Sequence, residues 1–153
     1  GFLPILLLMA SYIGGCAGST GGGMKVIRVM LLFKQGYREV IRLIHPNAII
    51  AIKVDNKAMS SKVVGAVWGF FALYVFSFSF MHLLLMSTGL DIVTSFSAVT
   101  ACLNNLGPGL GEVGENYSSI NSTSKWVLCM AMLLGRLEIF TLLVVLTPAF
   151  WRR

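Results

Sequence analysis

A run from Val63 to Met86 contains no Asp, Glu, Lys or Arg and is rich in phenylalanine. About 20 consecutive apolar residues are enough for an α-helix to cross the hydrocarbon core of a bilayer. The run therefore predicts a membrane-spanning helix. Composition agrees, because 56% of the residues are hydrophobic and 12% are charged, whereas soluble domains carry about 25% charged residues. The chain is predicted to be an all-α integral membrane protein.

A second apolar run extends from Trp126 to Trp151, with tryptophans at both ends as interface anchors. Between the two runs, Ile92–Leu103 is apolar but too short to span a bilayer. This region starts and ends on the same side of the membrane, so it enters and returns, and Asp91 suits the N-terminus of its helix. The pattern predicts a K⁺-channel-like unit over 62–153, with helices at 62–87, 91–102 and 125–151 and an extended pore segment at 103–109.

The first part of the chain reads as a broken helix. Phe2–Ile13 is apolar but short, and six glycines follow between Gly14 and Met24. A helical pattern then resumes at Lys25 and ends at His45-Pro46, since proline terminates helices. Residues 1–45 are predicted to be the closing helix of a preceding unit, interrupted by an intramembrane loop at 14–24. Residues 46–61 are predicted to be a cytoplasmic connector containing a short hairpin.

The net charge of +6 is unevenly distributed. Eight of the twelve Lys and Arg residues lie in 25–62, whereas 88–124 has no basic residue and three acidic ones. Basic loops remain in the cytoplasm, so 25–62 and the C-terminus are predicted to be cytoplasmic and 88–124 to lie outside. The charge thus indicates orientation in a lipid bilayer and argues against nucleic-acid binding. The basic face of 25–44 fits either anionic lipid head groups or a cytosolic partner.

The segment 103–109 is predicted at membrane depth without a helical pattern. Irregular backbone is tolerated there only where it is buried in protein or lines water. Cation filters use this exception, because their backbone carbonyls replace the hydration shell of the ion. Glycine gives the backbone the dihedral freedom that such a segment needs. Two interpretations stay open: an ordinary outer loop, or a cation filter formed by Leu103, Asn104, Asn105, Leu106 and Gly107.

The glycine-rich stretch is not a phosphate-binding loop. A Walker motif needs glycine directly before lysine, but Met24 separates Gly23 from Lys25, and the apolar flanks deny a strand–loop–helix setting. A helix over 2–13 would descend about 18 Å, past the middle of a ~30 Å core. A gate across an aqueous path and a close-packed glycine cluster are both possible here. The predicted gate residues are Gly18, Ser19, Thr20, Gly21, Gly22 and Gly23, together with Arg136.

Arg136 lies inside the last apolar run, where a charge is costly and indicates function. By helical rise it lies about 15 Å below Trp126, close to the depth of the glycine stretch. Free carbonyls of a broken helix are acceptors for a guanidinium. Arg136 is therefore predicted to tether the glycine stretch or to line the ion path. A structural pair of Arg136 and Glu138 with other helices is the alternative.

Other classes of site have little support. An intramembrane enzyme would need a paired nucleophile and base or a metal cluster, and neither His45 nor His82 has a partner at useful spacing. His82 fits a packed or interfacial histidine. The three cysteines are far apart without a C-x-x-C motif, which argues against a metal site or a disulfide framework. No enzymatic activity and no bound cofactor are expected.

Three stretches together resemble TrkH-type membrane subunits of the Trk/Ktr/HKT superfamily of potassium transporters. They are I-G-G-C-A-G-S-T-G-G-G-M-K at 13–25, L-N-N-L-G-P-G-L-G at 103–111, and G-R-L-E-I-F-T-L-L-V-V-L-T-P-A-F-W at 135–151. The resemblance implies four helix–pore–helix units around one pore, with this chain holding the end of the third unit and the whole fourth. It also implies a filter glycine at Gly107, a gating loop at 14–24 and a pore arginine at Arg136.

The resemblance further implies a multi-pass protein of the bacterial inner membrane that forms a homodimer. Its partners would be the upstream pore units and a cytosolic nucleotide-binding TrkA-type ring. The expected function is potassium transport through a carbonyl filter gated by the glycine loop, with K⁺ as the transported ion. Without the upstream filters this chain is not expected to conduct alone. The alternative is a non-conducting membrane scaffold for a cytosolic regulator.

Overall fold

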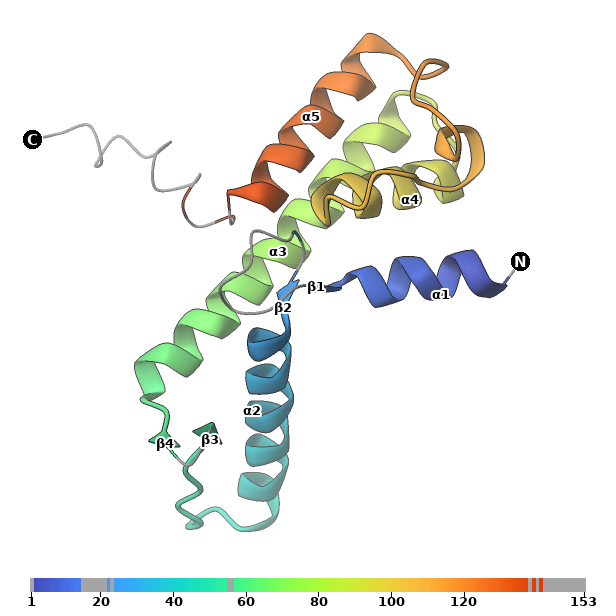
Figure 1. Ribbon diagram of the computed structural model, residues 1–153. Helices are drawn as coiled ribbons and strands as arrows, with labels where there is room; N and C mark the ends of the chain where they lie inside the picture. Colours follow the sequence, from blue (N-terminus) through green and yellow to red (C-terminus); the bar gives the residue numbers. More distant parts are fainter. Residues whose placement is uncertain are drawn as a thin grey trace, which may run out of the picture.

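The computed structural model describes residues 2–14, 22, 24–54, 57–137, 139 and 141, and its elements are arranged around one long helix (Figure 1). The helices are α1 (Phe2–Ser11), α2 (Val26–Ile44), α3 (Ser61–Ser87), α4 (Ile92–Leu103), the short 3-10 helix η1 (Gly111–Val113) and α5 (Ser122–Arg136). The strands are β1 (Ile13–Gly14), β2 (Met24–Lys25), β3 (Lys53–Val54) and β4 (Lys57–Ala58).

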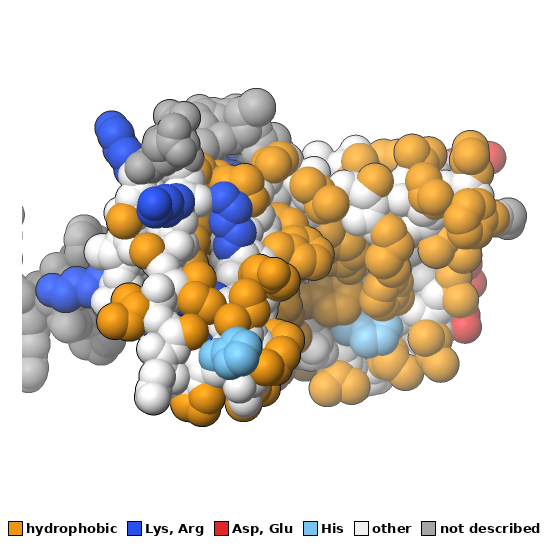
Figure 2. Space-filling model, turned by 90° about the horizontal axis from the view of Figure 1, so that it is seen from below, with side chains coloured by type: hydrophobic (Ala, Val, Ile, Leu, Met, Phe, Trp, Pro, Cys, Tyr) orange, Lys and Arg blue, Asp and Glu red, His pale blue; other side chains and the backbone are white. Residues whose placement is uncertain are grey.

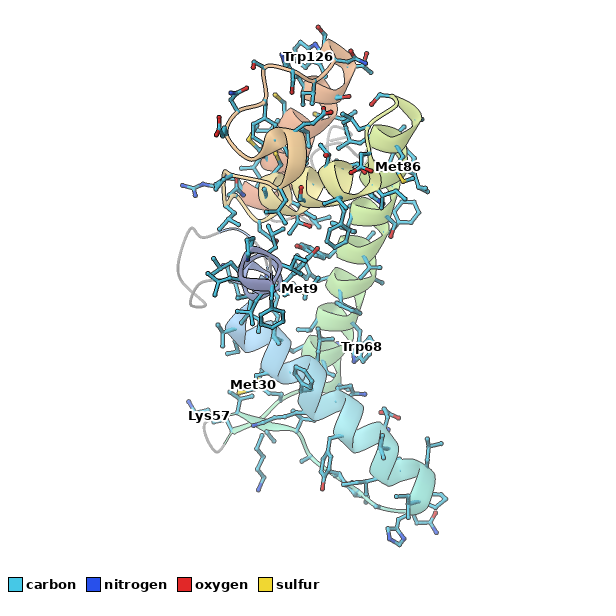
Figure 3. The ribbon with its side chains drawn as sticks, turned by 90° about the vertical axis from the view of Figure 1, so that its right-hand side faces the viewer. Met9, Met30, Lys57, Trp68, Met86 and Trp126 are labelled. Carbon is cyan, nitrogen blue, oxygen red and sulfur yellow. The ribbon has the colours of Figure 1, made fainter. Side chains whose placement is uncertain are left out.

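Helix α3 is the axis of the molecule and is present where the uncharged run predicted a helix. Ser60 caps it by accepting a hydrogen bond from the backbone N–H of Val63 at 3.4 Å. Among the described helices it alone is long and apolar enough to cross a membrane. Only 22% of its most apolar window is buried within this chain. In Figure 3, Trp68 and Met86 mark its two halves.

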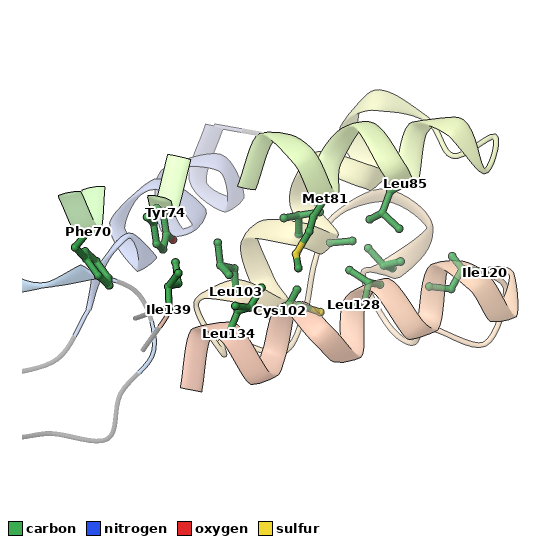
Figure 4. Close-up of a cluster of buried hydrophobic side chains, with 14 residues drawn as sticks. Phe70, Tyr74, Met81, Leu85, Cys102, Leu103, Ile120, Leu128, Leu134 and Ile139 are labelled. Carbon is green, nitrogen blue, oxygen red and sulfur yellow. The ribbon is translucent and has the colours of Figure 1, made fainter. Parts of the chain in front are cut away.

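Helices α4 and α5 pack against the C-terminal half of α3 (Figure 1). The short helix α4 is the most buried element, and most of its side chains from Thr94 to Leu103 are shielded. Its N-terminus is capped by Asp91, whose carboxylate accepts from the backbone N–H of Val93 at 3.2 Å. Figure 4 shows the hydrophobic cluster in which Leu103 and Cys102 of α4 meet Met81 of α3 and Leu134 of α5.

Helix α5 covers the first part of the helix predicted over 125–151, and Ile139 and Thr141 beyond it are helical as well. It begins earlier, at Ser122, and ends at Arg136, with Leu137 as its C-cap. The apolar pattern is uninterrupted here, but the backbone bends at Leu137, and hydropathy carries no information about such a bend. Gly135 is a poor helix former and directly precedes this end. Residues 142–153 lie outside the described part of the chain.

The ends of the glycine-rich stretch are held side by side. Strand β1 pairs in parallel with β2, with Ile13 opposite Met24, and the N–H of Met24 also donates to the carbonyl of Tyr12 at 3.1 Å. Helix α2 then starts at Val26 and ends at Ile44, as the sequence predicted. The chain therefore leaves α1 and enters α2 from nearly the same point (Figure 1).

The other half of α3 packs against α2. Strands β3 and β4 pair antiparallel, in agreement with the hairpin predicted in 46–61, and Ile52 and Val54 pack in one cluster with Val64 and Val67 of α3. The guanidinium of Arg28 lies 4.2 Å from the ring centroid of Phe70, a cation–π contact between α2 and α3. Figure 2 looks at the end that carries the hairpin. Lys and Arg side chains gather on this near part, and Asp and Glu side chains lie at the far edge.

Candidate functional site

The candidate site begins where α4 ends, in a hydrogen-bonded turn that reverses the backbone. The N–H of Leu106 donates to the carbonyl of Ala101 at 2.8 Å, and the N–H of Asn105 donates to the carbonyl of Cys102 at 3.1 Å. Asn105 has a φ of 53°, the left-handed conformation that this Schellman turn requires and that asparagine tolerates better than most residues. The carbonyls of Ala101 and Cys102 are hydrogen-bonded within this turn. The turn also sets the direction of the carbonyls from Leu103 onward.

Two glycines from other parts of the chain allow their backbone to come close to the carbonyls of Leu103 and Asn104. A Cβ atom on Gly135 of α5 would lie 1.9 Å from the carbonyl oxygen of Leu103. A Cβ atom on Gly22, in the glycine-rich stretch, would lie 2.3 Å from the carbonyl oxygen of Asn104. Only glycine fits at such distances. The candidate filter is thus approached by α5 and by the predicted gate.

Gly107 has the conformation expected of a filter glycine. Its φ of +102° is one that residues with a side chain rarely adopt, and the space around its missing Cβ is open within the described structure. The hydroxyl of Tyr117 donates to the carbonyl of Gly107 at 2.7 Å. Burial, helped by the nearby Cys102 thiol, raises the pKa of the Tyr117 phenol, so it stays protonated and able to donate. A carbonyl oxygen has two lone pairs, and this bond uses one.

Ser97 of α4 anchors the far end of the segment. Its hydroxyl oxygen accepts from the N–H of Leu110 at 2.9 Å, and its proton is shared between the carbonyls of Leu110 at 3.0 Å and Thr94 at 3.1 Å. The N–H of Gly109 donates to the carbonyl of Val113 in η1 at 3.2 Å. The extended segment is therefore fixed at both ends, while Asn105, Leu106, Gly107 and Pro108 remain exposed along one side.

Replacing Ser97 with alanine is expected to destabilise this anchor. Both backbone polar groups of Leu110 would lose their side-chain partner, and a buried polar group left unpaired costs about 1–3 kcal/mol. Thermal unfolding of the full-length protein in detergent should show a clear loss of stability. Ser95→Ala is the matched control, because Ser95 is equally buried but bonds the carbonyl of Ile92 within α4. Equal losses in both variants would contradict the anchoring role.

Arg136 ends α5 and lies near the same place. It lines a shallow pocket together with Asn105, Cys129, Met132 and Leu133. Among the predicted gate residues, Gly22 is described, whereas Gly18, Ser19, Thr20, Gly21 and Gly23 lie outside the described residues, as does Glu138. The tether between Arg136 and the glycine stretch therefore stays a prediction. The structure does bring Arg136 and Gly22 to the same end of α4, since both lie against Asn105 or Asn104.

The arrangement favours a cation. The C-terminus of a helix carries a partial negative charge equivalent to roughly half an elementary charge, and α4 ends on the carbonyls of Leu103 and Asn104. Within the described ranges, no group of three or more His, Cys, Asp or Glu residues could hold a metal ion through side chains. His82 lies against Phe78 and Phe96, with ring centroids 6.2 and 5.9 Å away, which fits a packed histidine.

Sequence reasoning missed the residues that support the segment from behind. Tyr117 in the loop after η1, Tyr74 of α3 and Ser11 of α1 contact it, and Ser97 of α4 holds Leu110 directly after it. None of them belongs to a motif, so the sequence around each one gives only a weak signal. Their roles depend on tertiary contacts across as many as 93 positions of sequence.

Comparison with known proteins gives consistent matches over the whole chain. A family model described as TrkH, a cation transport protein, matches residues 2–153. The chain is 57% identical over 151 residues to the Trk system potassium uptake protein TrkH of Escherichia coli K12, and 60% identical to that of Vibrio parahaemolyticus. It is 41% identical over 148 residues to the Trk system potassium uptake protein TrkG of Escherichia coli.

A solved structure matches as well. The crystal structure of the potassium transporter TrkH from Vibrio parahaemolyticus superposes with a TM-score of 0.90 at 60% identity, over 99% of this chain and 32% of that one. The alignments with the TrkH proteins of Escherichia coli K12 and Vibrio parahaemolyticus likewise include 99% of this chain and 31% of each relative. The chain therefore spans about a third of the proteins that it matches.

Proposed function

Because the chain belongs to the TrkH family of cation transport proteins, we propose that it forms part of the membrane path for potassium ions in a Trk-type uptake system. Members of this family are transporters and not enzymes. The mostly helical, membrane-protein fold agrees with this class. Transport needs no covalent step, so the residues of the site act by position, charge and dielectric surroundings.

The filter in this proposal is the segment from Leu103 to Gly107. The observation that carries it is the C-terminus of α4, which directs the negative end of a helix dipole and a run of backbone carbonyls to one place. One side of the segment is anchored by Ser97 and Tyr117, and the other side is exposed in this chain. The exposed side is where upstream units of the same protein would complete a ring of carbonyls around the ion.

The gate in this proposal is the glycine-rich stretch with Arg136. Support comes from Gly22, which contacts the backbone of Asn104 at the inner end of the filter. A loop in that position blocks the path of an ion leaving the filter. The pairing of β1 with β2 holds its ends, so movement between residues 14 and 24 would open the path without displacing α1 or α2.

The remaining partners follow from the family. The whole protein would be a multi-pass homodimer in the bacterial inner membrane, regulated by a cytosolic nucleotide-binding TrkA-type ring. Lys and Arg side chains gather at the end that carries β3 and β4 (Figure 2), which supports an orientation with this end in the cytoplasm. The C-terminus is proposed to lie on the same side.

Replacing Gly107 with serine in the full-length transporter tests the filter. A side chain at a φ of +102° costs on the order of 1–3 kcal/mol, and the backbone relieves it by turning the Gly107 carbonyl. In cells that lack other potassium uptake, we expect Rb⁺ uptake to fall and the Rb⁺-to-Na⁺ uptake ratio to drop about tenfold. Membrane amounts of each variant are measured alongside.

Gly89→Ser is the matched control for this test. Gly89 has a similar φ of +91° and an open surrounding, but it lies in the turn after α3. It should therefore suffer comparable backbone strain without a change in selectivity. If Gly107→Ser reaches the membrane and transports with unchanged rate and ratio, the segment is an outer loop. The scaffold interpretation would then replace the filter.

A further inference from the structure

The side chain of Asn104 is tied at both ends to helices outside the pore segment. We propose that this amide is a positioning group that holds the filter backbone by joining it to α1 and α3. The inference rests on the proposed function of Leu103–Gly107 as a filter. It assigns a specificity-determining role to Ser11 and Tyr74, which contribute no atom to that segment.

The geometry of the connection is a directed chain of hydrogen bonds. The hydroxyl of Tyr74 donates to Oδ1 of Asn104 at 2.5 Å, and Nδ2 of Asn104 donates to Oγ of Ser11 at 2.9 Å. The hydroxyl of Ser11 in turn donates to the carbonyl of Leu8 at 2.6 Å. Each hydroxyl proton is used once, so the chain has one consistent direction from α3 through Asn104 to α1.

Two of the three side chains in this hydrogen-bonded chain are buried, and Ser11 is half-buried, which increases the effect of the chain. Asn104 is 6% exposed and Tyr74 is 4% exposed. In such surroundings an unpaired amide is costly, so the side chain is held in the orientation that satisfies both ends. Apolar side chains of similar size would fill the same volume without that constraint. A polar residue at position 104 therefore indicates that the orientation of this side chain is controlled.

Orientation matters at this residue because its backbone carbonyl is part of the candidate filter. The oxygen faces Gly22, and the following residue, Asn105, already has the left-handed φ of 53°. Holding the side chain of Asn104 limits rotation of its backbone, and so fixes where the carbonyl points. Ser11 lies at the end of α1, directly before the pairing that closes the glycine stretch. The same chain thus fixes the filter relative to the base of the gate.

Tyr74→Phe and Ser11→Ala test the proposal without changing a filter residue. Each removes one hydroxyl from the chain in the full-length transporter. We expect each to lower the Rb⁺-to-Na⁺ uptake ratio about fivefold, the factor that corresponds to loss of one hydrogen bond of ordinary strength. Ser11→Thr keeps a hydroxyl at the same place and should restore the ratio, a result that loss of packing alone does not predict.

Tyr12→Phe is the matched control. Tyr12 lies beside Tyr74, with ring centroids 6.3 Å apart, and its hydroxyl contacts that of Thr100 at 2.9 Å. This variant loses a part-buried hydroxyl bond beside Tyr74 but does not touch Asn104. It should keep the wild-type ratio. A drop as large as in Tyr74→Phe would overturn the proposal, because it would make the effect one of general packing.

The outcomes separate this inference from the filter itself. If Gly107→Ser changes selectivity while Tyr74→Phe and Ser11→Ala do not, the filter stands and the positioning role of Asn104 is wrong. If Gly107→Ser also has no effect, the filter assignment fails first. For a variant with reduced membrane amount, thermal stabilisation of the purified transporter by K⁺ and by Na⁺ replaces uptake. An unchanged preference for K⁺ in that measurement would likewise overturn the inference.

Discussion

Gly135→Ala is expected to abolish potassium uptake or to reduce it more than tenfold. The added methyl group would lie 1.9 Å from the carbonyl oxygen of Leu103 and 2.7 Å from its carbonyl carbon. Both atoms belong to backbone at the end of a buried helix, which has little room to yield. Overpacking of this kind costs typically 1–3 kcal/mol or more. Helix α5 must move away from α4, or the first carbonyl of the proposed filter must turn.

Two measurements on the full-length protein check this expectation, namely Rb⁺ uptake in cells and thermal unfolding after purification. Gly65→Ala in α3 is the matched control, because the space around that helical glycine is open within the described chain. In a helix this change is favourable by roughly 0.5–1 kcal/mol, so the control should retain uptake and stability. Normal uptake and stability in Gly135→Ala would show that α5 does not approach the filter as closely as the structure has it.

The sequence predicted the elements of this fold well where a local signal existed. The uncharged run predicted α3, the proline after His45 predicted the end of α2, and Asp91 predicted the start of α4. Each of these signals acts through hydropathy or backbone chemistry within a few residues. The bend at Leu137 was not predicted, because the apolar pattern continues past it without a break. The extension of this helix to 151 stays a prediction, since residues 142–153 lie outside the described part of the chain.

The sequence predicted the unusual backbone of the candidate site, but it did not predict the side chains that hold this backbone in place. Glycine at 107 predicted unusual dihedrals, and the structure has a positive φ at Gly107. The positive φ at Asn105 was not predicted. The contacts that hold this backbone come from distant positions, such as Ser11 and Tyr117. Nothing in the local sequence pairs a serine at the end of one helix with an asparagine at the end of another. Such pairings are set by tertiary packing alone.

Gly22→Ala is expected to raise Rb⁺ flux severalfold while leaving the Rb⁺-to-Na⁺ ratio unchanged. A methyl group on Gly22 would lie 2.3 Å from the carbonyl oxygen of Asn104, so one of the two must move. Asn104 is held by Tyr74, by Ser11 and by the end of α4, which makes its displacement costly. Gly22 lies between chain ends that are joined by the short β1–β2 pairing. The gate should therefore yield, and the filter should keep its shape.

Flux through the purified full-length transporter in liposomes measures this effect without a cytosolic regulator. Gly14→Ala provides a second way to move the same residue, because its methyl group would lie 2.2 Å from the carbonyl oxygen of Gly22. It acts from β1 and leaves Asn104 untouched. Increased flux in both variants would identify displacement of the gate as the cause. A lower ion ratio in Gly22→Ala alone would mean that the filter moved instead, and unchanged flux in both would remove Gly22 from the gate.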